Sequence, residues 1–269
     1  INFDMVNNPM KVYYNNISTW KNATDNFQSL MVQNFDNYNC SCSDNTCTTT
    51  GTVYCDKPNS YDTGVNDELN VYLYNTSTNT KESKVNYTNS SDGIIRNMIP
   101  NQVYYWELKS EPLVYGYVKA LGERRLISID GIRNVRDLGG LKVDSNNDGV
   151  VDGTLKYGKL FRGEKTSTSQ SGVDALVSLG ITEELDLRKS SEVGSSEKHL
   201  DNYKLRETIH YQIDREHYLS NYNKTRSVVT EAMEDVVAGK NIYFHCRIGA
   251  DRTGTLAYIL EGLLQVQEE

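Results

Sequence analysis

The sequence contains no long apolar run and has fewer basic than acidic residues. Its 269 residues include 28 Lys and Arg against 36 Asp and Glu, which gives a net charge of −8 at pH 7. A pI near 5.1 argues against nucleic acid or an anionic membrane as a standing partner, because both are polyanions. No stretch has the length and apolarity of a membrane span or the pattern of a signal peptide. We therefore expect no integral membrane segment.

Cysteine is also scarce, and its five copies are unevenly placed. Four of them stand within a polar stretch of sixteen residues: Cys40, Cys42, Cys47 and Cys55. The even count and polar setting predict two disulfides in a surface loop, with zinc as the alternative even though no Cys-x2-Cys pair occurs. Disulfides form in oxidising compartments, so we expect an extracytoplasmic protein that is secreted, periplasmic or on the cell surface. The chain begins at Ile1 and not at Met, as expected after removal of an export segment.

The fifth cysteine, Cys246, lies between two apolar stretches. Ile242-Tyr243-Phe244 is typical of a buried strand, and residues 255–266 carry apolar side chains at helical spacing. A loop that closes onto a helix N-terminus points backbone N–H groups inward, which favours a phosphate dianion and lowers the pKa of a thiol. Cys246 is therefore predicted to be a thiolate nucleophile, although an isolated cysteine beside a strand is more often a structural thiol. Arg252 can present a bidentate fork to two phosphoryl oxygens.

The stretch from His245 to Gly254 resembles the signature loop of the protein tyrosine phosphatase superfamily, His-Cys-x5-Arg followed by Thr-Gly. It is also similar to the Gly-Lys-Asp-Arg-Thr-Gly loop of the bacterial tyrosine/lipid phosphatases with atypical P-loops, except that Ala250 replaces the lysine. Three upstream blocks resemble further motifs of that group and occur in the same order: Gly131–Gly140, Leu160–Gly163 and Leu185–Arg188. The resemblance implies an α/β phosphatase domain over residues 122–269, with a parallel-type sheet flanked by helices. Because relatives continue through further helices, we expect the natural chain to extend past Glu269.

This resemblance implies a phosphoric monoester hydrolase that works through a cysteinyl-phosphate intermediate and needs no cofactor. Cys246 is then its nucleophile. The substrate phosphate is expected to bind to the loop residues Arg247, Ile248, Gly249, Ala250, Asp251 and Arg252. His245 is expected to hydrogen-bond the loop backbone, and Thr253 to hydrogen-bond the thiolate or to cap the helix.

The substrate is predicted from what the loop lacks. With alanine at position 250, the loop has no extra cation for a second phosphate, so phosphotyrosine is expected over phosphoinositides or inositol phosphates, which are the alternative. The partner is then a phosphorylated protein or a small phosphomonoester. A catalytically silent phosphate-binding or adhesive surface protein is a further alternative. Such a protein is expected to have lost Cys246 or Arg252, and both are present.

A departing phenolate or alkoxide needs a proton donor, and several aspartates are candidates. Asp214 lies 32 residues before Cys246, the separation at which many dual-specificity phosphatases of the superfamily carry their general acid. Asp251 is the rival, because it lies inside the phosphate loop itself, as in the atypical bacterial group. Two weaker candidates are expected to brace turns instead: Asp137, together with Arg136, and Asp186.

Residues 1–121 show little helical periodicity and form a separate predicted domain. Three alternating runs predict strands of an all-β sandwich: Val71–Tyr74, Val103–Leu108 and Val114–Val118. Met98–Trp106 is similar to the Leu-x-Pro-x-Thr-x-Tyr-Tyr corner of fibronectin type III-like modules, which implies a domain that presents a surface to a partner. A carbohydrate-binding module with an exposed Trp20 is the alternative.

The segment from Asp144 to Asp152 has the spacing of a calcium loop. Oxygen-bearing side chains stand at positions 1, 3, 5 and 9, with glycine at position 6: Asp144, Asn146, Asp148, Asp152 and Gly149. The bidentate acid expected at position 12 is replaced by Leu155. A structural calcium ion is one prediction from this pattern, and a solvated hairpin turn is the other.

Overall fold

The structure is a computed structural model that describes residues 60–88, 90–120, 124–207 and 222–267. The chain divides into two compact units, Ile1–Glu123 and Arg124–Glu269. The cluster of four cysteines, Trp20 and Asp214 lie outside the described residues. No helix in the described part of the chain is long and apolar enough to cross a membrane.

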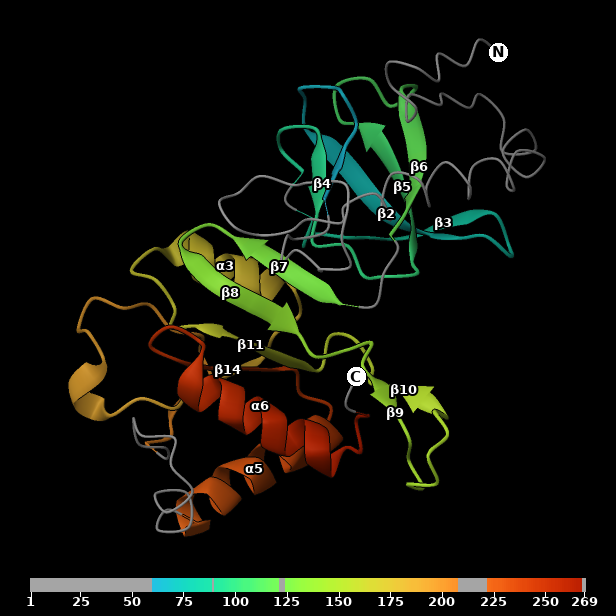
Figure 1. Ribbon diagram of the computed structural model, residues 1–269. Coiled ribbons are helices and arrows are strands. Elements are labelled where there is room, and N and C mark those ends of the chain that lie inside the picture. Colours follow the sequence, from blue (N-terminus) through green and yellow to red (C-terminus); the bar gives the residue numbers. More distant parts are fainter. Residues whose placement is uncertain (1–59, 89, 121–123, 208–221, 268–269) are drawn as a thin grey trace, which may run out of the picture. The chain divides into compact units, whose positions relative to one another are not determined.

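Between residues 60 and 120, the described part of the first unit forms two antiparallel β-sheets (Figure 1). The larger sheet has the order β3-β2-β5-β6, and its strands are Thr80–Lys84 (β3), Leu69–Asn75 (β2), Val103–Leu108 (β5) and Tyr115–Lys119 (β6). The smaller sheet pairs Ser60–Asp62 (β1) with Ile94–Arg96 (β4). The sequence predicts an all-β structure for this part of the chain, and the antiparallel sheets confirm it.

The core of the first unit is aromatic as well as aliphatic. Alternation along β5 places Tyr104 and Trp106 on one face, where both are buried together with Ile95 and Met98. Gly116 stands opposite Trp106 on β6, and a Cβ added there would lie only 2.7 Å from the indole ring. Glycine at this position therefore makes room for a buried tryptophan.

The second unit is built on a six-stranded mixed sheet of order β13-β12-β14-β11-β8-β7. Its four parallel strands are Tyr203–Leu205 (β13), Glu183–Asp186 (β12), Ile242–Cys246 (β14) and Leu160–Glu164 (β11). Two antiparallel strands complete it: Ile132–Asp137 (β8) and Arg125–Ile129 (β7). The α/β class is confirmed. The sheet is mixed and not parallel throughout, because Asp130-Gly131 joins β7 to β8 in a two-residue hairpin turn with Gly131 at φ 76°.

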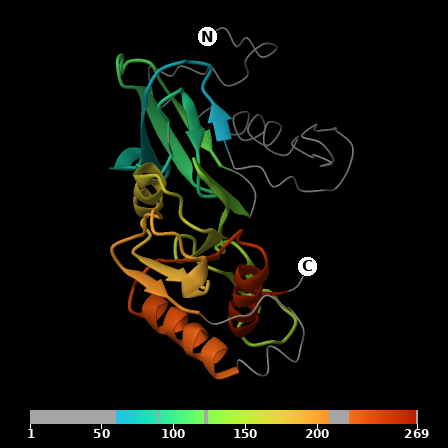
Figure 2. The ribbon, with the colours of Figure 1, turned by 90° about the vertical axis from the view of Figure 1, so that its left-hand side faces the viewer.

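In the described residues of this unit, helices cover the sheet on both faces (Figures 1 and 2). Gln170–Ser178 (α3) lies on one face, and Tyr222–Val237 (α5) and Asp251–Leu263 (α6) lie on the other. The central strand β14 is buried along its whole length, as is typical of a parallel strand covered by helices on both sides.

Alternation along β14 decides where the chemistry-bearing side chains point. Ile242, Phe244 and Cys246 belong to the apolar core that includes α5 and α6, so Tyr243 and His245 face the opposite side of the sheet. Cys246 is the last residue of the strand. Ligands of open α/β sheets bind at the carboxyl ends of the strands, and the predicted phosphate loop begins at that edge.

Candidate active site

The predicted phosphate loop connects β14 to α6, and the helix begins at Asp251, four residues earlier than its apolar periodicity indicates. Gly249 has a φ of 73°, in the left-handed region. A Cβ added to Gly249 would lie 2.4 Å from the carbonyl carbon of Gly163 in β11. Glycine is therefore required twice over, for its backbone conformation and for close packing on the neighbouring strand.

Two side chains from neighbouring strands hold the carbonyl groups of this loop. Arg162 Nη2 donates to the carbonyl oxygen of Gly249 at 2.9 Å. Asn134 Nδ2 donates to the same oxygen at 3.1 Å and to that of Ile248 at 3.3 Å. In a trans peptide the N–H points away from the carbonyl of the same peptide group. Because these carbonyl oxygens point toward Asn134 and Arg162, the N–H groups of the same peptides point away from those two side chains.

Cys246 is buried at the base of the loop, and its thiol pKa is lowered. Burial by itself raises the pKa, but hydrogen bonding from Thr253 and from the backbone N–H groups of Ile248 and Gly249 outweighs it. The Thr253 hydroxyl is buried and makes no hydrogen bond to an oxygen or nitrogen of the described residues. Thr253 stands on the first turn of α6 and contributes to the lowered pKa of the Cys246 thiol.

Arg252 is nearly fully buried and is held in a bidentate ion pair. Its Nη1 and Nη2 lie 2.7 and 2.9 Å from the two carboxylate oxygens of Glu192. Glu192 ends a short 3₁₀ turn, Ser190–Glu192, and also accepts a hydrogen bond from the backbone N–H of Lys189 at 2.8 Å. A guanidinium held in one plane at the mouth of the loop is oriented before any ligand arrives.

A cavity of about 310 Å³ opens at this edge of the sheet. Its wall is formed by residues of the predicted loop: Cys246, Arg247, Ile248, Asp251 and Arg252. Within the loop, Gly249 is buried against β11 and Ala250 is exposed. Ile248 is half exposed, which gives the cavity mouth an apolar side chain. The cavity wall thus contains Cys246 and four of the six predicted loop residues, whereas Asp214 lies outside the described residues.

His245 precedes the nucleophile and is fully buried on the other side of β14. Its Nδ1 lies 3.2 Å from the carbonyl oxygen of Cys246, and its Nε2 lies 2.8 Å from Oε1 of Glu184. The first contact is the hydrogen bond to the loop backbone that the sequence predicts. The second was not foreseen.

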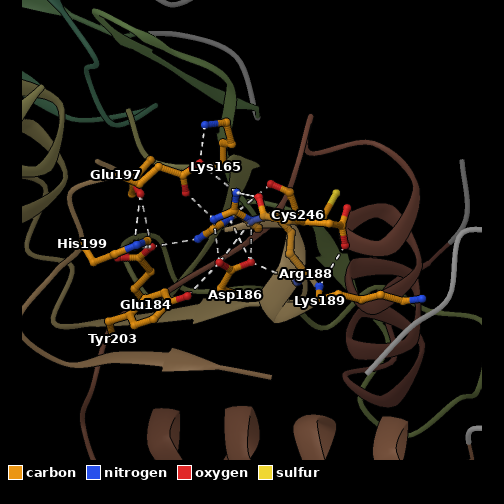
Figure 3. A network of polar contacts seen from close by, with 12 residues as sticks. Lys165, Glu184, Asp186, Arg188, Lys189, Glu197, His199, Tyr203 and Cys246 are labelled. Atoms are coloured by element: carbon orange, nitrogen blue, oxygen red, sulfur yellow. Dashed lines mark hydrogen bonds and ion pairs between the residues drawn. The ribbon is translucent and has the colours of Figure 1, made fainter. Parts of the chain in front are cut away.

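A network of buried charges surrounds Arg188, at the end of β12 (Figure 3). The guanidinium binds Asp186 through Nε and Nη2, and Glu197 through Nη1 and Nη2, at distances between 2.6 and 3.1 Å. Tyr203 donates its hydroxyl to Asp186 at 3.0 Å. Burial raises the pKa of Asp186, but Arg188 and His245 hold it below its usual range. Asp186 is thus a buried ion-pair partner that does not line the cavity.

Asp137 is likewise committed to a structural ion pair. The sequence prediction pairs it with Arg136, but its partner is Arg125, whose Nη1 lies 2.9 Å from Oδ2 with both side chains buried. Alternation explains the error, because Arg136 and Asp137 are adjacent in β8 and point to opposite faces. The carboxylate also accepts backbone N–H groups of Gly139 and Gly158 at 2.9 Å, so it does brace the predicted turn.

The predicted calcium loop is a hairpin between Lys142–Val143 (β9) and Gly153–Thr154 (β10). Asp144 accepts backbone N–H groups of Asp148 and Gly149, Asn146 Nδ2 donates to Asp148, and Asp152 binds the Ser145 hydroxyl. The oxygens are therefore engaged within the turn and do not converge. Among the described residues, one acidic group has the spacing to hold a metal ion, and it lies elsewhere: Glu183, Glu231 and Asp235. The structure does not support the calcium site, and the hairpin prediction accounts for the sequence.

Four side chains of the site were not assigned from the sequence. Asn134 and Arg162 lie inside the upstream motifs, so the sequence marked both positions but did not indicate that they hydrogen-bond the loop. Glu184 and Glu192 lie about sixty positions from the residues that they bind, and no motif marks either one.

Comparison with models of known protein families identifies one family. The profile of the Tyrosine phosphatase family matches residues 127–269, which is more than half of the chain. No curated protein matches the sequence. The matched range contains the whole loop, the cavity and the buried charge network, and it leaves the β-sheets of the first unit unidentified.

Proposed function

The chain belongs to the tyrosine phosphatase family, and we propose that it hydrolyses phosphotyrosine in proteins through a cysteinyl-phosphate formed on Cys246. Membership implies a phosphoric monoester hydrolase whose chemistry needs no cofactor. The observation that carries the proposal is a buried thiol of lowered pKa that shares one cavity with the oriented guanidinium of Arg252.

In the first step, the Cys246 thiolate attacks phosphorus as the bond to the leaving oxygen breaks. Arg252 and the loop N–H groups are the available donors for the equatorial phosphoryl oxygens, where negative charge is concentrated in the transition state. The bidentate pair with Glu192 supports this role, because it keeps the guanidinium in position between turnovers.

The leaving oxygen takes a proton from a carboxylic acid, which then accepts a proton from the water that hydrolyses the thiophosphate bond. Asp214 and Asp251 are the two candidates that we retain. Asp251 is exposed and lines the cavity. Thr253, beside the sulfur, is suited to stabilise the thiolate as it departs from phosphorus.

The substrate class is supported by the composition of the cavity. Ile248 offers an apolar contact to an aryl ring, and Ala250 offers no charge to a second phosphate. Arg188, one cation that could have served a second phosphate, is enclosed by two carboxylates. These features favour a phosphotyrosine side chain over a phosphoinositide, within the bacterial tyrosine/lipid subgroup that the loop resembles.

Substitution of the nucleophile tests the mechanism. Cys246→Ser is expected to abolish turnover of an aryl phosphate while vanadate or tungstate still protects the protein against thermal unfolding. Rapid acid quenching of the wild-type enzyme with ³²P-labelled substrate is expected to trap phosphate on Cys246. Substantial turnover in the serine variant, or loss of wild-type activity in a metal chelator, would overturn the cysteine mechanism. A panel of phosphotyrosine peptides, phosphoserine peptides and phosphoinositides then decides the substrate.

For the first unit we propose a fibronectin type III-like sandwich over residues 1–121 that presents a surface to a partner. One contact supports it: the Tyr104 hydroxyl accepts the backbone N–H of Ile99, five residues upstream, at 2.7 Å. A tyrosine bonded to nearby upstream backbone is a hallmark of immunoglobulin-like sandwiches. The extracytoplasmic location stays a prediction from the cysteine cluster, and peptide mapping of disulfides in the native protein tests it.

A further inference from the structure

Glu184 is a buried carboxylate that the proposed chemistry does not use. It lies in β12 and is fully buried, which is rare for a glutamate unless it is paired. Four donors meet its two oxygens: His245 Nε2 at 2.8 Å, His199 Nδ1 at 2.9 Å, the Thr166 hydroxyl at 3.4 Å and the backbone N–H of Leu200 at 2.8 Å. Figure 3 shows the contact of Glu184 with His199. Burial raises the pKa of Glu184, but its hydrogen bonds to His199 and His245 lower it to about 2. The group is thus an anion next to His245.

The contacts continue from Glu184 to the nucleophile. The second ring nitrogen of His245, Nδ1, lies 3.2 Å from the carbonyl oxygen of Cys246 and 3.8 Å from Oδ1 of Asp186. The near neighbours of both ring nitrogens are acceptors, so both contacts are hydrogen bonds when the imidazole carries a proton on each nitrogen. The His245 ring faces Glu184 and Asp186 from β12, and Cys246 and the ring of Tyr243 from its own strand.

The Cys246 carbonyl belongs to the first peptide of the phosphate loop. Fixing its direction also fixes the direction of the Arg247 N–H, because the peptide is planar. A carboxylate that holds His245 in one orientation therefore acts on the loop where the loop leaves the strand. The N–H groups of Ile248 and Gly249 in the same loop hydrogen-bond the sulfur and lower the pKa of the Cys246 thiol.

Building on the proposed phosphatase reaction, we infer that Glu184 is a positioning residue that acts through His245 to orient the start of the phosphate loop and to stabilise the Cys246 thiolate. It touches neither the substrate nor the sulfur. Its effect passes through two contacts, Glu184 to His245 and His245 to the Cys246 carbonyl.

The test compares Glu184→Gln with Glu183→Gln in the full chain. Glu183 is the adjacent residue of β12 and is equally buried, but its carboxylate binds Lys204 and Lys240. Both variants remove one buried charge from the same strand, and only one of them touches His245. The readouts are the rate of Cys246 alkylation by iodoacetamide from pH 4 to 9, the steady-state kinetics on an aryl phosphate, and the midpoint of urea unfolding.

Glu184→Gln is expected to raise the apparent pKa of the thiol by about one unit, so alkylation and kcat/KM at a pH below that pKa fall about tenfold. At high pH the alkylation rate should return to that of the wild type. Glu183→Gln should keep the wild-type thiol titration, whatever it does to stability. Adding Glu184→Gln to His245→Gln should shift the thiol no further than His245→Gln alone, because the two residues act in series.

A wild-type thiol titration in folded Glu184→Gln would overturn the inference, even if the unfolding midpoint falls, because that pattern belongs to a merely structural carboxylate. Should Glu184→Gln not fold, Glu184→Asp takes its place; it keeps the charge but withdraws it by one methylene, and an unshifted thiol pKa counts against the inference in the same way. Alkylation does not require turnover, so a wild-type protein without phosphatase activity refutes the proposed function separately from the role of Glu184.

Discussion

The two units of this protein bury different kinds of side chain. In the described part of the first unit, Glu107 is the one charged side chain that is buried, and the core consists of aliphatic residues, tyrosines and Trp106. The second unit buries many ionisable groups: Arg125, Asp137, Asp144, Glu183, Glu184, Asp186, Arg188, His245 and Arg252. Burying charge costs free energy that ion pairing only partly returns, so the buried groups nearest to Cys246, namely His245 and Arg252 with their carboxylate partners, indicate a functional site.

Two arginines of the second unit refine this comparison. Arg188 and Arg252 are both buried, and each binds carboxylate. Arg188 is enclosed by Asp186 and Glu197 and takes no part in the cavity wall, whereas Arg252 pairs with Glu192 and lines the cavity beside Cys246. Burial of an arginine alone therefore does not identify a ligand-binding group; its position relative to the nucleophile does.

The largest expected effect concerns the proton donor. Of the two candidates, Asp251 lies within the described residues of the second unit and Asp214 lies outside them. If Asp214 is the acid, Asp214→Asn should lower kcat about 10²–10⁴-fold for a poor leaving group such as an alkyl phosphate. The loss should be much smaller for an activated nitrophenyl phosphate, whose leaving group needs no proton. Steady-state kinetics over a series of leaving groups measures the difference.

Asp251→Asn is the matched variant for this measurement. It should change KM and leave the slope of rate against leaving-group pKa as in the wild type. The reverse pattern is a steeper slope in Asp251→Asn and the wild-type slope in Asp214→Asn. That result would assign the acid to Asp251, the loop residue that lines the cavity.

The next effect concerns stability. Arg188→Met removes the arginine that pairs with buried Asp186 and leaves Glu197 with Lys165 alone, so the free energy of unfolding should fall by about 3–5 kcal/mol in urea denaturation. Arg206→Met is the control, because its pair with Glu231 is partly exposed and should contribute only about 0–1 kcal/mol. Equal losses of unfolding free energy in the two variants would show that the buried ion pairs of Arg188 stabilise the protein no more than a partly exposed pair does.

The pH dependence of stability should differ between the units. In the second unit, burial raises the pKa of Glu184 and Glu197, but their hydrogen bonds lower both to about 2. A folded-state pKa below the unfolded value stabilises the protein above about pH 4.5, and this contribution is lost as the pH falls towards 2. In the described part of the first unit, Asp92 is the carboxyl whose pKa is lowered comparably, through Arg96. Hydrogen-exchange protection between pH 5 and 2.5 should therefore decline first in β12 and β14; an equal or earlier decline in β2 and β5 would contradict the comparison.

The sequence was most informative where function and backbone geometry depend on neighbouring residues. The order strand, loop, helix around Cys246 follows from local periodicity, and Gly249 is fixed by its own backbone conformation. The contact of His245 with the Cys246 carbonyl is also local, between adjacent residues. Each of these was open to prediction because the determining atoms lie close together in the chain.

Pairings across the sheet could not be obtained in this way. Glu184 reaches His245 because β12 and β14 are neighbours in space, and Glu192 reaches Arg252 from a separate turn. Asp137 was assigned the wrong arginine because adjacency in a strand places two side chains on opposite faces. The calcium prediction is not supported for a related reason, since spacing alone does not show whether oxygens converge on an ion or accept the N–H groups of their own turn.

The smallest expected effect tests the first unit alone. Tyr104→Phe removes the hydroxyl that accepts the backbone N–H of Ile99, and the ring stays in the apolar core. An unsatisfied, partly buried N–H should lower the free energy of unfolding of this unit by about 1–3 kcal/mol. Trp106 packs in the same core, and both tryptophans of the chain stand in its first half, so fluorescence in a urea titration reports on this unit. Turnover of an aryl phosphate should stay within about twofold of the wild type, because the loop, the cavity and the charge network all belong to the second unit. A fall in turnover that parallels the fall in stability would show that the active site of the second unit depends on the folding of the first unit. The two units could then not be treated as independent.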